Sequence, residues 1–379
     1  MNNRKILSRI AAAALAGASI FTATAAFAGE ITIWCWDPNF NVAIMKEAGA
    51  RYTAKHPETT FNVVDFAKAD VEQKLQTALS SGTTDALPDI VLIEDYGAQK
   101  YLQSFPGNFA ELSGKIDYSG FAPYKVQLMT VDGKVYGMPF DSGVTGMYYR
   151  KDYLEQAGYK PEDMQNITWD KFIEIGKAIE AKTGKKMMGL DPNDAGLIRI
   201  LMQSASGWYF DAEGNLTISN NPALKAALET EQKLLQANIY KPTAGWTEWV
   251  GSFTSGDVAA VVTGVWITGT VKAQADQAGK WGVAPIPRMD VEGGTHASNL
   301  GGSSWYVMES SAEKDAFFGG EPVWQNFSDW LAKVPSVNYG VFTNEVDTAV
   351  AANLPGLAKG ASVDEVLKAI QSQAEGQIQ

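Results

Sequence analysis

Short apolar runs alternate with segments of helical periodicity along the first third of the chain. Residues 31–34, 61–66 and 89–93 are almost wholly apolar, which is typical of buried strands. Between them, residues 42–52 and 71–79 place apolar side chains at helical spacing. Apolar strands that alternate with helices predict a parallel sheet covered on both faces, and ligands of such sheets bind beyond the carboxyl ends of the strands.

The rest of the chain continues the alternation and predicts a second lobe. Periodicity predicts an extended unit at 136–149, helices at 168–181, 197–205, 222–237 and 246–253, and strands at 187–190, 258–263, 283–285 and 303–307. Glycine pairs at 293–294 and 301–302 mark a loop that returns the chain to the first lobe. We expect an α/β fold with an N-terminal lobe of residues 29–139 plus 288–316 and a C-terminal lobe of residues 140–287 plus 317–379.

The first 28 residues have the pattern of a signal peptide. A basic start with Arg4, Lys5 and Arg9 precedes an apolar run at 10–21 and the small-x-small sequence that ends at Ala28. The run is too short to span a bilayer of about 30 Å, so we expect cleavage after Ala28 and no direct membrane insertion. The expected location is the periplasm.

Charge and composition narrow the choice of partners. Loss of three cations and no anion with the signal segment moves the formal net charge from −12 to −15. Such an acidic surface argues against nucleic acid and anionic membrane as partners. With two histidines and one cysteine, Cys35, we predict no metal cluster and no cofactor. The chain is nevertheless rich in tryptophan, with 11 residues.

Aromatic and acidic side chains recur together where predicted strands and helices begin or end. An aromatic face packs against the C–H face of a sugar ring, and carboxylates accept hydrogen bonds from its hydroxyl groups. We assign Trp34, Trp169, Trp281, Trp324 and Trp330 to the core. We take the tryptophans that lie beside Gly, Pro or Asp as candidate ligand residues: Trp36, Trp246, Trp266 and Trp305. Trp208 is a further candidate.

Five segments resemble one known family, the extracellular solute-binding proteins, family 1, of bacterial carbohydrate importers of the ATP-binding-cassette (ABC) type. They are ITIWCWD at 31–37, KLQTAL at 74–79 with PDI at 88–90, VYGMPFDSGVTGMYYRKD at 135–152, the segment 256–266 that begins with GDV, and GGSSW at 301–305. Within the family, WCWDPNF and residues 318–335 are similar to lactose-binding members.

The resemblance implies a two-lobed periplasmic-binding-protein fold of type II character, with a hinge and a ligand cleft between the lobes. It implies a monomer that captures a mono- or disaccharide and delivers it to a membrane permease, without enzymatic activity. The ligand residues that it implies are Trp36, Asp37, Asn39, Asp95, Tyr96, Asp141, Trp266, Gly301, Gly302 and Ser303, with Asp65 and Asp191 as further matches.

One segment departs from the family pattern. Relatives carry a pair of helices after the GGSSW strand, whereas here residues 310–315 run almost directly into Phe317. Some tens of residues of the first lobe are therefore expected to be missing, and apolar sheet surface would be exposed if no other segment covers it.

Two other functions fit the same residues. Tryptophans and aspartates also form cages for cationic ligands such as a polyamine or betaine, whose binding is strongly salt-dependent. A secreted glycoside hydrolase also combines aromatic platforms with paired carboxylates, for which Asp37, Asp95 and Asp141 are candidates. These aspartates follow polar, turn-rich loops, whereas a catalytic acid usually needs an apolar pocket.

Overall fold

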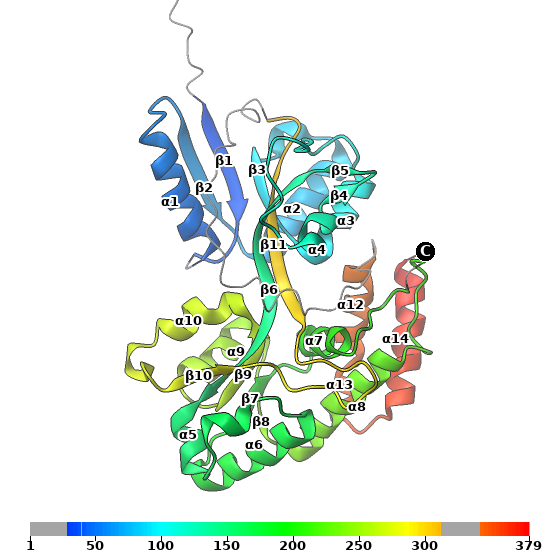
Figure 1. The fold of residues 1–379 in the computed structure, drawn as a ribbon. Coiled ribbons are helices and arrows are strands. Elements are labelled where there is room, and N and C mark those ends of the chain that lie inside the picture. Colours follow the sequence, from blue (N-terminus) through cyan, green and yellow to red (C-terminus); the bar gives the residue numbers. More distant parts are fainter. Residues whose placement is uncertain (1–28, 39, 212, 312–341, 379) are drawn as a thin grey trace, which may run out of the picture.

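Two lobes are joined by two long crossing strands in the computed structural model (Figure 1). The structure describes residues 29–38, 40–211, 213–311 and 342–378. The predicted signal peptide, Asn39 and the junction near Phe317 lie outside the described residues. Among the described residues, no helix has the length and apolar character needed to cross a membrane.

The N-terminal lobe is built on three parallel strands. β1 (Glu30–Cys35) pairs with β2 (Thr60–Asp65) on one side and with β3 (Ile90–Glu94) on the other. The predicted strands and the first two helices are confirmed to within a few residues. The helices and the small hairpin of this lobe are α1 (Asn41–Thr53), α2 (Lys68–Ser81), α3 (Asp95–Ser104), α4 (Pro123–Leu128), β4 (Thr130–Val131) and β5 (Lys134–Val135).

The lobes share one sheet because β6 (Gly137–Arg150) runs through both. Its first half pairs with β11 (Asn299–Val307), which pairs with β3 in the N-terminal lobe. Its second half lies between β9 (Ala260–Gly264) and β10 (Trp281–Ala284) in the C-terminal lobe. The strand order is β10-β6-β11-β3-β1-β2, with β9 also on β6. The predicted extended unit at 136–149 is thus one continuous strand.

Glycine permits close packing where the two strands cross. The register of β6 and β11 shifts between Asn299 and Gly302, and Gly302 has a φ of +89°. A Cβ atom at Gly302 would lie 2.6 Å from an Asp95 carboxylate oxygen and 3.0 Å from the Gly143 nitrogen. The position therefore has room for no side chain, and its backbone conformation favours glycine.

The C-terminal lobe surrounds the second half of β6 with helices. Thr168 accepts a hydrogen bond from Lys171 N (3.2 Å) and Asn221 accepts one from Leu224 N (3.0 Å), so both residues cap helices. The elements are α5 (Lys151–Gln156), α6 (Trp169–Thr183), β7 (Met188–Leu190), α7 (Gly196–Ser204), α8 (Pro222–Ala237), β8 (Tyr240–Pro242), α9 (Gly245–Thr254) and α10 (Thr268–Lys272). Short 3₁₀ turns lie at Thr84–Ala86, Pro161–Met164, Val265–Ile267 and Ala275–Gln277.

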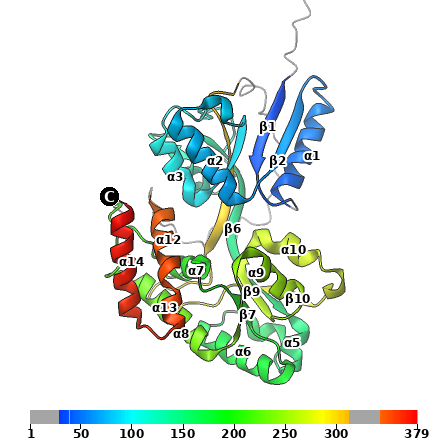
Figure 2. The same cartoon turned by 180° about the vertical axis from the view of Figure 1, so that it is seen from behind.

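Three C-terminal helices pack beside the C-terminal lobe, as seen from behind in Figure 2. They are α12 (Thr343–Asn353), α13 (Pro355–Ala358) and α14 (Val363–Gln377), and α13 and α14 contact α8. α12 also reaches the N-terminal lobe, where Lys100 of α3 lies 2.6 Å from Glu345. These helices are not among the elements that the sequence predicts, and we propose from their contacts with α8 that they belong to the C-terminal lobe.

Residues that follow the expected lobe boundary at 287/288 still form hydrogen bonds with the C-terminal lobe. Arg288 N donates to Ile167 O (2.8 Å) and Thr295 N donates to Ser204 O (2.8 Å), and both partners belong to the C-terminal lobe. Asn299 is the first residue of β11. We therefore propose that the second crossing begins near Asn299.

Candidate functional site

Acidic and aromatic side chains follow the carboxyl ends of the three parallel strands. Trp36 and Asp37 come directly after β1, and Asp65 ends β2 beside Cys35. Trp36 and Asp37 are half-buried and Asp65 is exposed. β1 and β2 end toward the C-terminal lobe, above α9 and α10 (Figure 1). These three side chains therefore lie on the edge of the N-terminal lobe that faces its partner lobe.

Glu94 contributes the charged group at the end of β3. It is paired with Lys68, the first residue of α2, and its side chain is 16% exposed. The next residue, Asp95, starts α3 and is 1% exposed. The structure thus places Glu94 at the edge and turns the predicted residue Asp95 into the interior.

Asp95 forms a buried ion pair. Lys125 Nζ of α4 lies 2.6 Å from Asp95 Oδ1 and 2.8 Å from Oδ2, and it also donates to Ser303 O at 2.8 Å. Burial raises the pKa of Asp95 to about 6, against the opposing effect of the Lys125 charge. Both oxygens of Asp95 therefore face a protein cation, and its role in this conformation is to bind α4 to the crossing strands.

Asp141 and Ser303 lie opposite one another on the two crossing strands. They are directly paired in the register of β6 and β11, and Ser303 Oγ donates to Asp141 Oδ1. Burial raises the pKa of Asp141, whereas Lys125 and the Ser303 hydrogen bond oppose this shift. Asp141 is half-buried, while Ser303 is 4% exposed. Of the two predicted residues, Asp141 is the one with exposed surface.

Tyr96 and Trp208 come from different lobes and stack on each other. Their rings are 5.6 Å apart with an interplanar angle of 18°, and the two residues are 1% and 3% exposed. The Tyr96 hydroxyl donates to Asn299 O (3.1 Å) and accepts from Gly301 N (3.2 Å) at the start of β11. In this conformation the pair forms a buried contact between the lobes and not a surface for a ligand.

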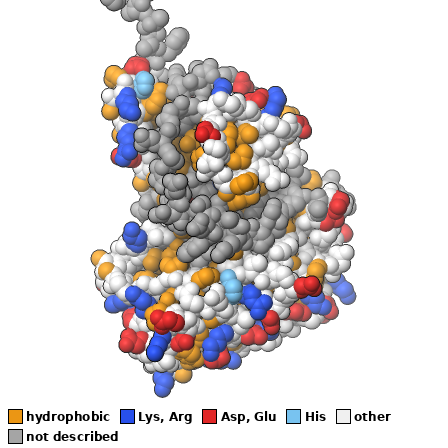
Figure 3. Space-filling view, viewed as in Figure 1, with side chains coloured by type: hydrophobic (Ala, Val, Ile, Leu, Met, Phe, Trp, Pro, Cys, Tyr) orange, Lys and Arg blue, Asp and Glu red, His pale blue; other side chains and the backbone are white. Residues whose placement is uncertain are grey.

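Three indoles of the C-terminal lobe form a continuous cluster. The ring of Trp246 lies 5.4 Å from that of Trp249 and 5.7 Å from that of Trp266, with tilts of 38° and 36°. Trp246 is 57% exposed, whereas Trp249 and Trp266 are half-buried. Figure 3 shows hydrophobic side chains gathered over α9 at the edge of this lobe nearest the N-terminal lobe. We call these three residues the indole cluster.

The indole cluster is attached to the crossing strands. Trp266 lies in the turn that follows β9, and its Nε1 donates to Leu300 O in β11 at 2.8 Å. This bond fixes the orientation of the ring and occupies its one donor. The face of the indole, rather than its nitrogen, is what Trp266 can offer to a ligand.

Asp191 lies at the end of β7 and holds the loop that leads into α9. Its Oδ2 accepts a hydrogen bond from Gly245 N (2.6 Å), and its Oδ1 accepts bonds from Asn193 N (2.9 Å) and Nδ2 (3.1 Å). Asp191 therefore binds the residue that precedes Trp246 and lies beside the indole cluster. Both of its carboxylate oxygens accept hydrogen bonds from other residues of the protein.

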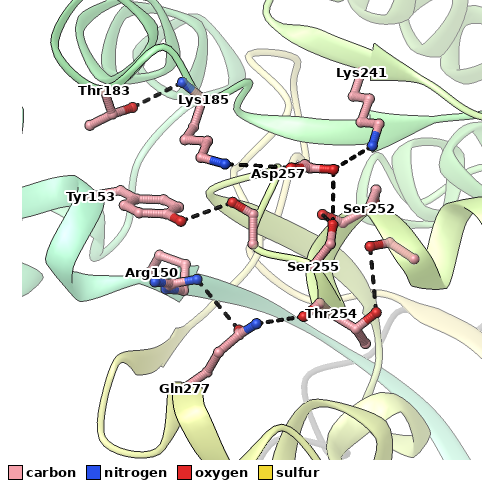
Figure 4. Close-up of polar contacts among 12 residues, drawn as sticks. Arg150, Tyr153, Thr183, Lys185, Lys241, Ser252, Thr254, Ser255, Asp257 and Gln277 are labelled. Atoms are coloured by element: carbon pink, nitrogen blue, oxygen red, sulfur yellow. Dashed lines mark hydrogen bonds and ion pairs between the residues drawn. The ribbon is translucent and has the colours of Figure 1, made fainter.

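The opposite end of α9 is fixed by a separate polar cluster, shown in Figure 4. Asp257 accepts from Lys241 Nζ (2.6 Å), Lys185 Nζ (3.4 Å) and Ser255 Oγ (2.9 Å) in the turn before β9. Hydrogen bonds from Lys241 and Ser255 lower the pKa of Asp257 to about 2. The Gly-Asp turn that resembled the family thus has a structural role.

The remaining predicted residues belong neither to the residues at the strand ends of the N-terminal lobe nor to the indole cluster. Trp305 is 3% exposed and packs edge-on against Phe140 with ring centroids 5.3 Å apart. Gly301 and Gly302 are buried at the crossing of the strands. Trp169 is in the core as expected, while Trp34 and Trp281 are half-buried. Nothing is described for Asn39, Trp324 and Trp330.

The structure therefore divides the predicted site into surface and interior. The residues that lie in the interior are Asp95, Tyr96, Trp208, Ser303 and Trp305. Lys125 of α4 binds Asp95 and the Ser303 carbonyl, whereas the three aromatic residues pack against other rings. The predicted ligand residues do not include Glu94, Lys68 and Lys125. Glu94 could have been included, because like Asp95 it lies at the carboxyl end of β3, whereas no local pattern indicates a buried lysine on α4. The predicted residues that retain exposed surface on the facing edges are Trp36, Asp37, Asp65, Asp141, Asp191, Trp246 and Trp266.

Cavities and metal-binding groups add nothing to these residues. A hollow of about 510 Å³ lies beside α4, and one of about 280 Å³ lies between β8 and α9. Neither is lined by a predicted ligand residue. Within the described parts of the chain, no three His, Cys, Asp or Glu side chains are arranged to hold a metal ion.

Comparison with known proteins relates this geometry to a family. A lactose-binding protein of Rhizobium radiobacter is 63% identical over an alignment that covers 100% of both chains. The alignment has 422 positions, 43 more than the 379 residues of this chain. The chain thus lacks a counterpart for at least 43 positions of this alignment.

Solved structures share the architecture. The galacto-N-biose/lacto-N-biose I-binding protein of the ABC transporter of Bifidobacterium longum superposes with a TM-score of 0.76 at 20% identity, over 92% of this chain and 97% of that one. An ABC transporter associated binding protein of B. animalis subsp. lactis, in complex with β-1,6-galactobiose, superposes with a TM-score of 0.64 at 25% identity, over 91% and 86%. The expected two-lobed fold is confirmed.

The model of one family, bacterial extracellular solute-binding proteins, matches residues 47–318, which is more than half of the chain. The relative from R. radiobacter shows that the likeness extends over the full length. This chain belongs to the bacterial extracellular solute-binding proteins.

Proposed function

We propose that this protein binds a small neutral saccharide, of the lactose type, between its two lobes. The observation that carries the proposal is the indole cluster, in which Trp246 is exposed and Trp266 is half-buried on the edge of the C-terminal lobe. Aromatic faces of this kind pack against sugar rings. Asp37, Asp65, Asp141 and the Glu94–Lys68 pair would supply hydrogen bonds from the N-terminal lobe and the crossing strands. The 63% identity with a lactose-binding protein supports a lactose-type ligand.

A sugar held by both lobes would favour the closed arrangement of the protein. A ligand shifts such an equilibrium only if it binds one arrangement more tightly than the other, which contacts to both lobes provide. The closed complex would then be recognised by the permease of an ABC importer. We propose that the protein acts as a monomer in the periplasm after cleavage behind Ala28, with no cofactor.

Membership in a family of binding proteins argues against the glycoside hydrolase alternative. Two of the three candidate carboxylates are also engaged, because Asp95 pairs with Lys125 and Asp141 accepts from Ser303.

Calorimetric titration tests the proposal. Wild-type protein is titrated with lactose and with a panel of other neutral disaccharides, and Trp266→Ala is expected to weaken binding by about 1 to 2 kcal/mol. Trp281→Phe is the matched control, because Trp281 is another half-buried tryptophan of this lobe and lies outside the indole cluster. Unchanged affinity in a folded Trp266→Ala protein would remove Trp266 from the site.

A further inference from the structure

Among the described residues, the most exposed indole lies at the start of a helix whose first backbone N–H groups are bound by two carboxylates. Trp246 is the second residue of α9 and is 57% exposed, the largest value among the exposed large hydrophobic side chains of the described residues. A single exposed apolar residue is ordinary on a protein surface. Trp246 differs because its ring contacts two further indoles, so its exposed face extends a larger aromatic surface.

Two carboxylates bind the backbone immediately before Trp246. Ala244 N donates to Glu248 Oε2 at 2.9 Å, and Gly245 N donates to Asp191 Oδ2 at 2.6 Å. Glu248 belongs to α9 itself, whereas Asp191 comes from the end of β7. The side chain of Asp191 thus connects the start of α9 to the end of β7.

Geometry and charge both suit Asp191 to this task. The first N–H groups of a helix have no partner within the helix, and a carboxylate placed there is favoured by the helix dipole. Ala244, at the N-cap position, has no side chain that could accept such a bond. The second oxygen of Asp191 is held by Asn193, so the carboxylate itself cannot rotate without breaking hydrogen bonds.

We propose that Asp191 is a positioning residue that holds Trp246 in place as the outer part of the sugar platform. Trp266 forms the inner part, anchored to the crossing strand at Leu300. The inference rests on the proposed function and gives Asp191 a role distinct from direct contact with the ligand. A preorganised ring binds more tightly because less side-chain and loop motion is lost on binding.

A double-mutant cycle tests the proposal with lactose as the probe. Trp246→Ala is expected to weaken binding roughly threefold to tenfold, as befits one aromatic contact. Asp191→Ala is expected to cause a similar loss, and the double variant is expected to bind within about twofold of Trp246→Ala alone. Asp191→Asn, which retains one acceptor, should lie between wild type and Asp191→Ala and serves as the second variant if Asp191→Ala fails to fold.

Asp257→Asn is the matched control. It also removes a carboxylate that stabilises a turn beside α9, but at the end of the helix remote from Trp246. Its melting temperature should fall while its affinity for lactose stays within twofold of wild type, so a loss of stability alone would not reproduce the effect of Asp191→Ala.

Several results would overturn the proposal. A folded Asp191→Ala protein with unchanged affinity would do so, and so would a double variant whose loss equals the product of the two single losses, because Asp191 would then act independently of Trp246. A wild-type protein that binds no saccharide overturns the proposed function and this inference together. Normal wild-type binding with unaffected variants overturns this inference alone.

Discussion

The ammonium group of Lys125 lies 2.6 Å and 2.8 Å from the two carboxylate oxygens of Asp95, and both residues are almost completely buried. A third bond, to Ser303 O, connects the pair to β11. The pair therefore joins α3, α4 and a crossing strand. Its energetic consequence is asymmetric, since losing one partner leaves the other charge buried and alone.

Lys125→Met is predicted to destabilise the protein by about 3 to 5 kcal/mol, the range for a buried ion pair that loses one member. Because burial raises the pKa of Asp95 to about 6, the loss should be smaller at pH 5, where Asp95 can take up a proton, than at pH 8. Urea denaturation at the two pH values measures it. The combined Asp95→Asn and Lys125→Met variant is the control and should recover part of the stability. Equal destabilisation at both pH values would contradict this account.

Glu231 of α8 is predicted to make stability fall with rising pH. It is 1% exposed, and neither carboxylate oxygen has a hydrogen-bond partner among the described residues. Burial raises its pKa from 4.5 to about 8. Between these two pH values the folded protein holds a proton that the unfolded chain releases. The contribution of Glu231 to the free energy of unfolding is therefore largest below pH 4.5, falls by up to about 1.4 kcal/mol per pH unit above it, and levels off above pH 8.

Glu231→Gln isolates this effect, because the amide has a similar shape and does not titrate. The variant should be close to wild type at pH 5 and increasingly more stable than wild type toward pH 8, as measured by urea denaturation. A difference between the two proteins that does not change with pH would show that Glu231 is charged, or is paired, throughout.

Gly302→Ala is predicted to cost about 1 to 3 kcal/mol or more, because the new Cβ atom meets Asp95 in addition to the backbone strain at φ +89°. Gly107→Ala provides the matched control, since Gly107 has a φ of +81° and no atom within 4 Å of the added carbon. The two variants share the backbone strain, so the difference between their losses in melting temperature measures the destabilisation that the steric clash at Gly302 causes. Equal losses would mean that the crossing strands have room to adjust.

Much of the fold could be predicted because its signals are local. The apolar runs of β1, β2 and β3 and the periodicity of α6 and α8 depend on residues close in sequence. β6 was predicted as one extended unit, but its passage through both lobes depends on pairing with β9, β10 and β11, which no local pattern shows. For the same reason, no local pattern shows that the chain still bonds to the C-terminal lobe as late as Thr295.

The exposure of each candidate site residue could not be predicted from the sequence, since neighbouring residues can point in opposite directions. Glu94 and Asp95 are adjacent at the end of β3, but the start of α3 turns Asp95 toward Lys125 while Glu94 stays at the edge. Trp208 and Tyr96 had the composition of a sugar site and instead pack on each other across the lobes. A tryptophan in a loop contacts either a ligand or another lobe, and composition does not distinguish the two.

Binding of a neutral saccharide is predicted to be nearly independent of salt. Between low salt and about 0.5 M salt, the dissociation constant for lactose should change less than twofold, because exposed charges are screened but an uncharged ligand gains nothing from them. Titration at the two salt concentrations gives the comparison, with a polyamine as the control ligand. Salt-sensitive binding of the polyamine, together with no binding of lactose at either salt concentration, would favour the cationic ligand over the sugar.

A crystal structure of the protein grown with lactose would show where the sugar binds. We expect one sugar between the lobes, with a ring against Trp246 or Trp266 and hydroxyl groups within hydrogen-bond distance of at least one of Asp37, Asp65, Glu94 and Asp141. A sugar bound elsewhere, with both indoles remote from it, would mean that the ligand does not bind at the facing edges of the lobes.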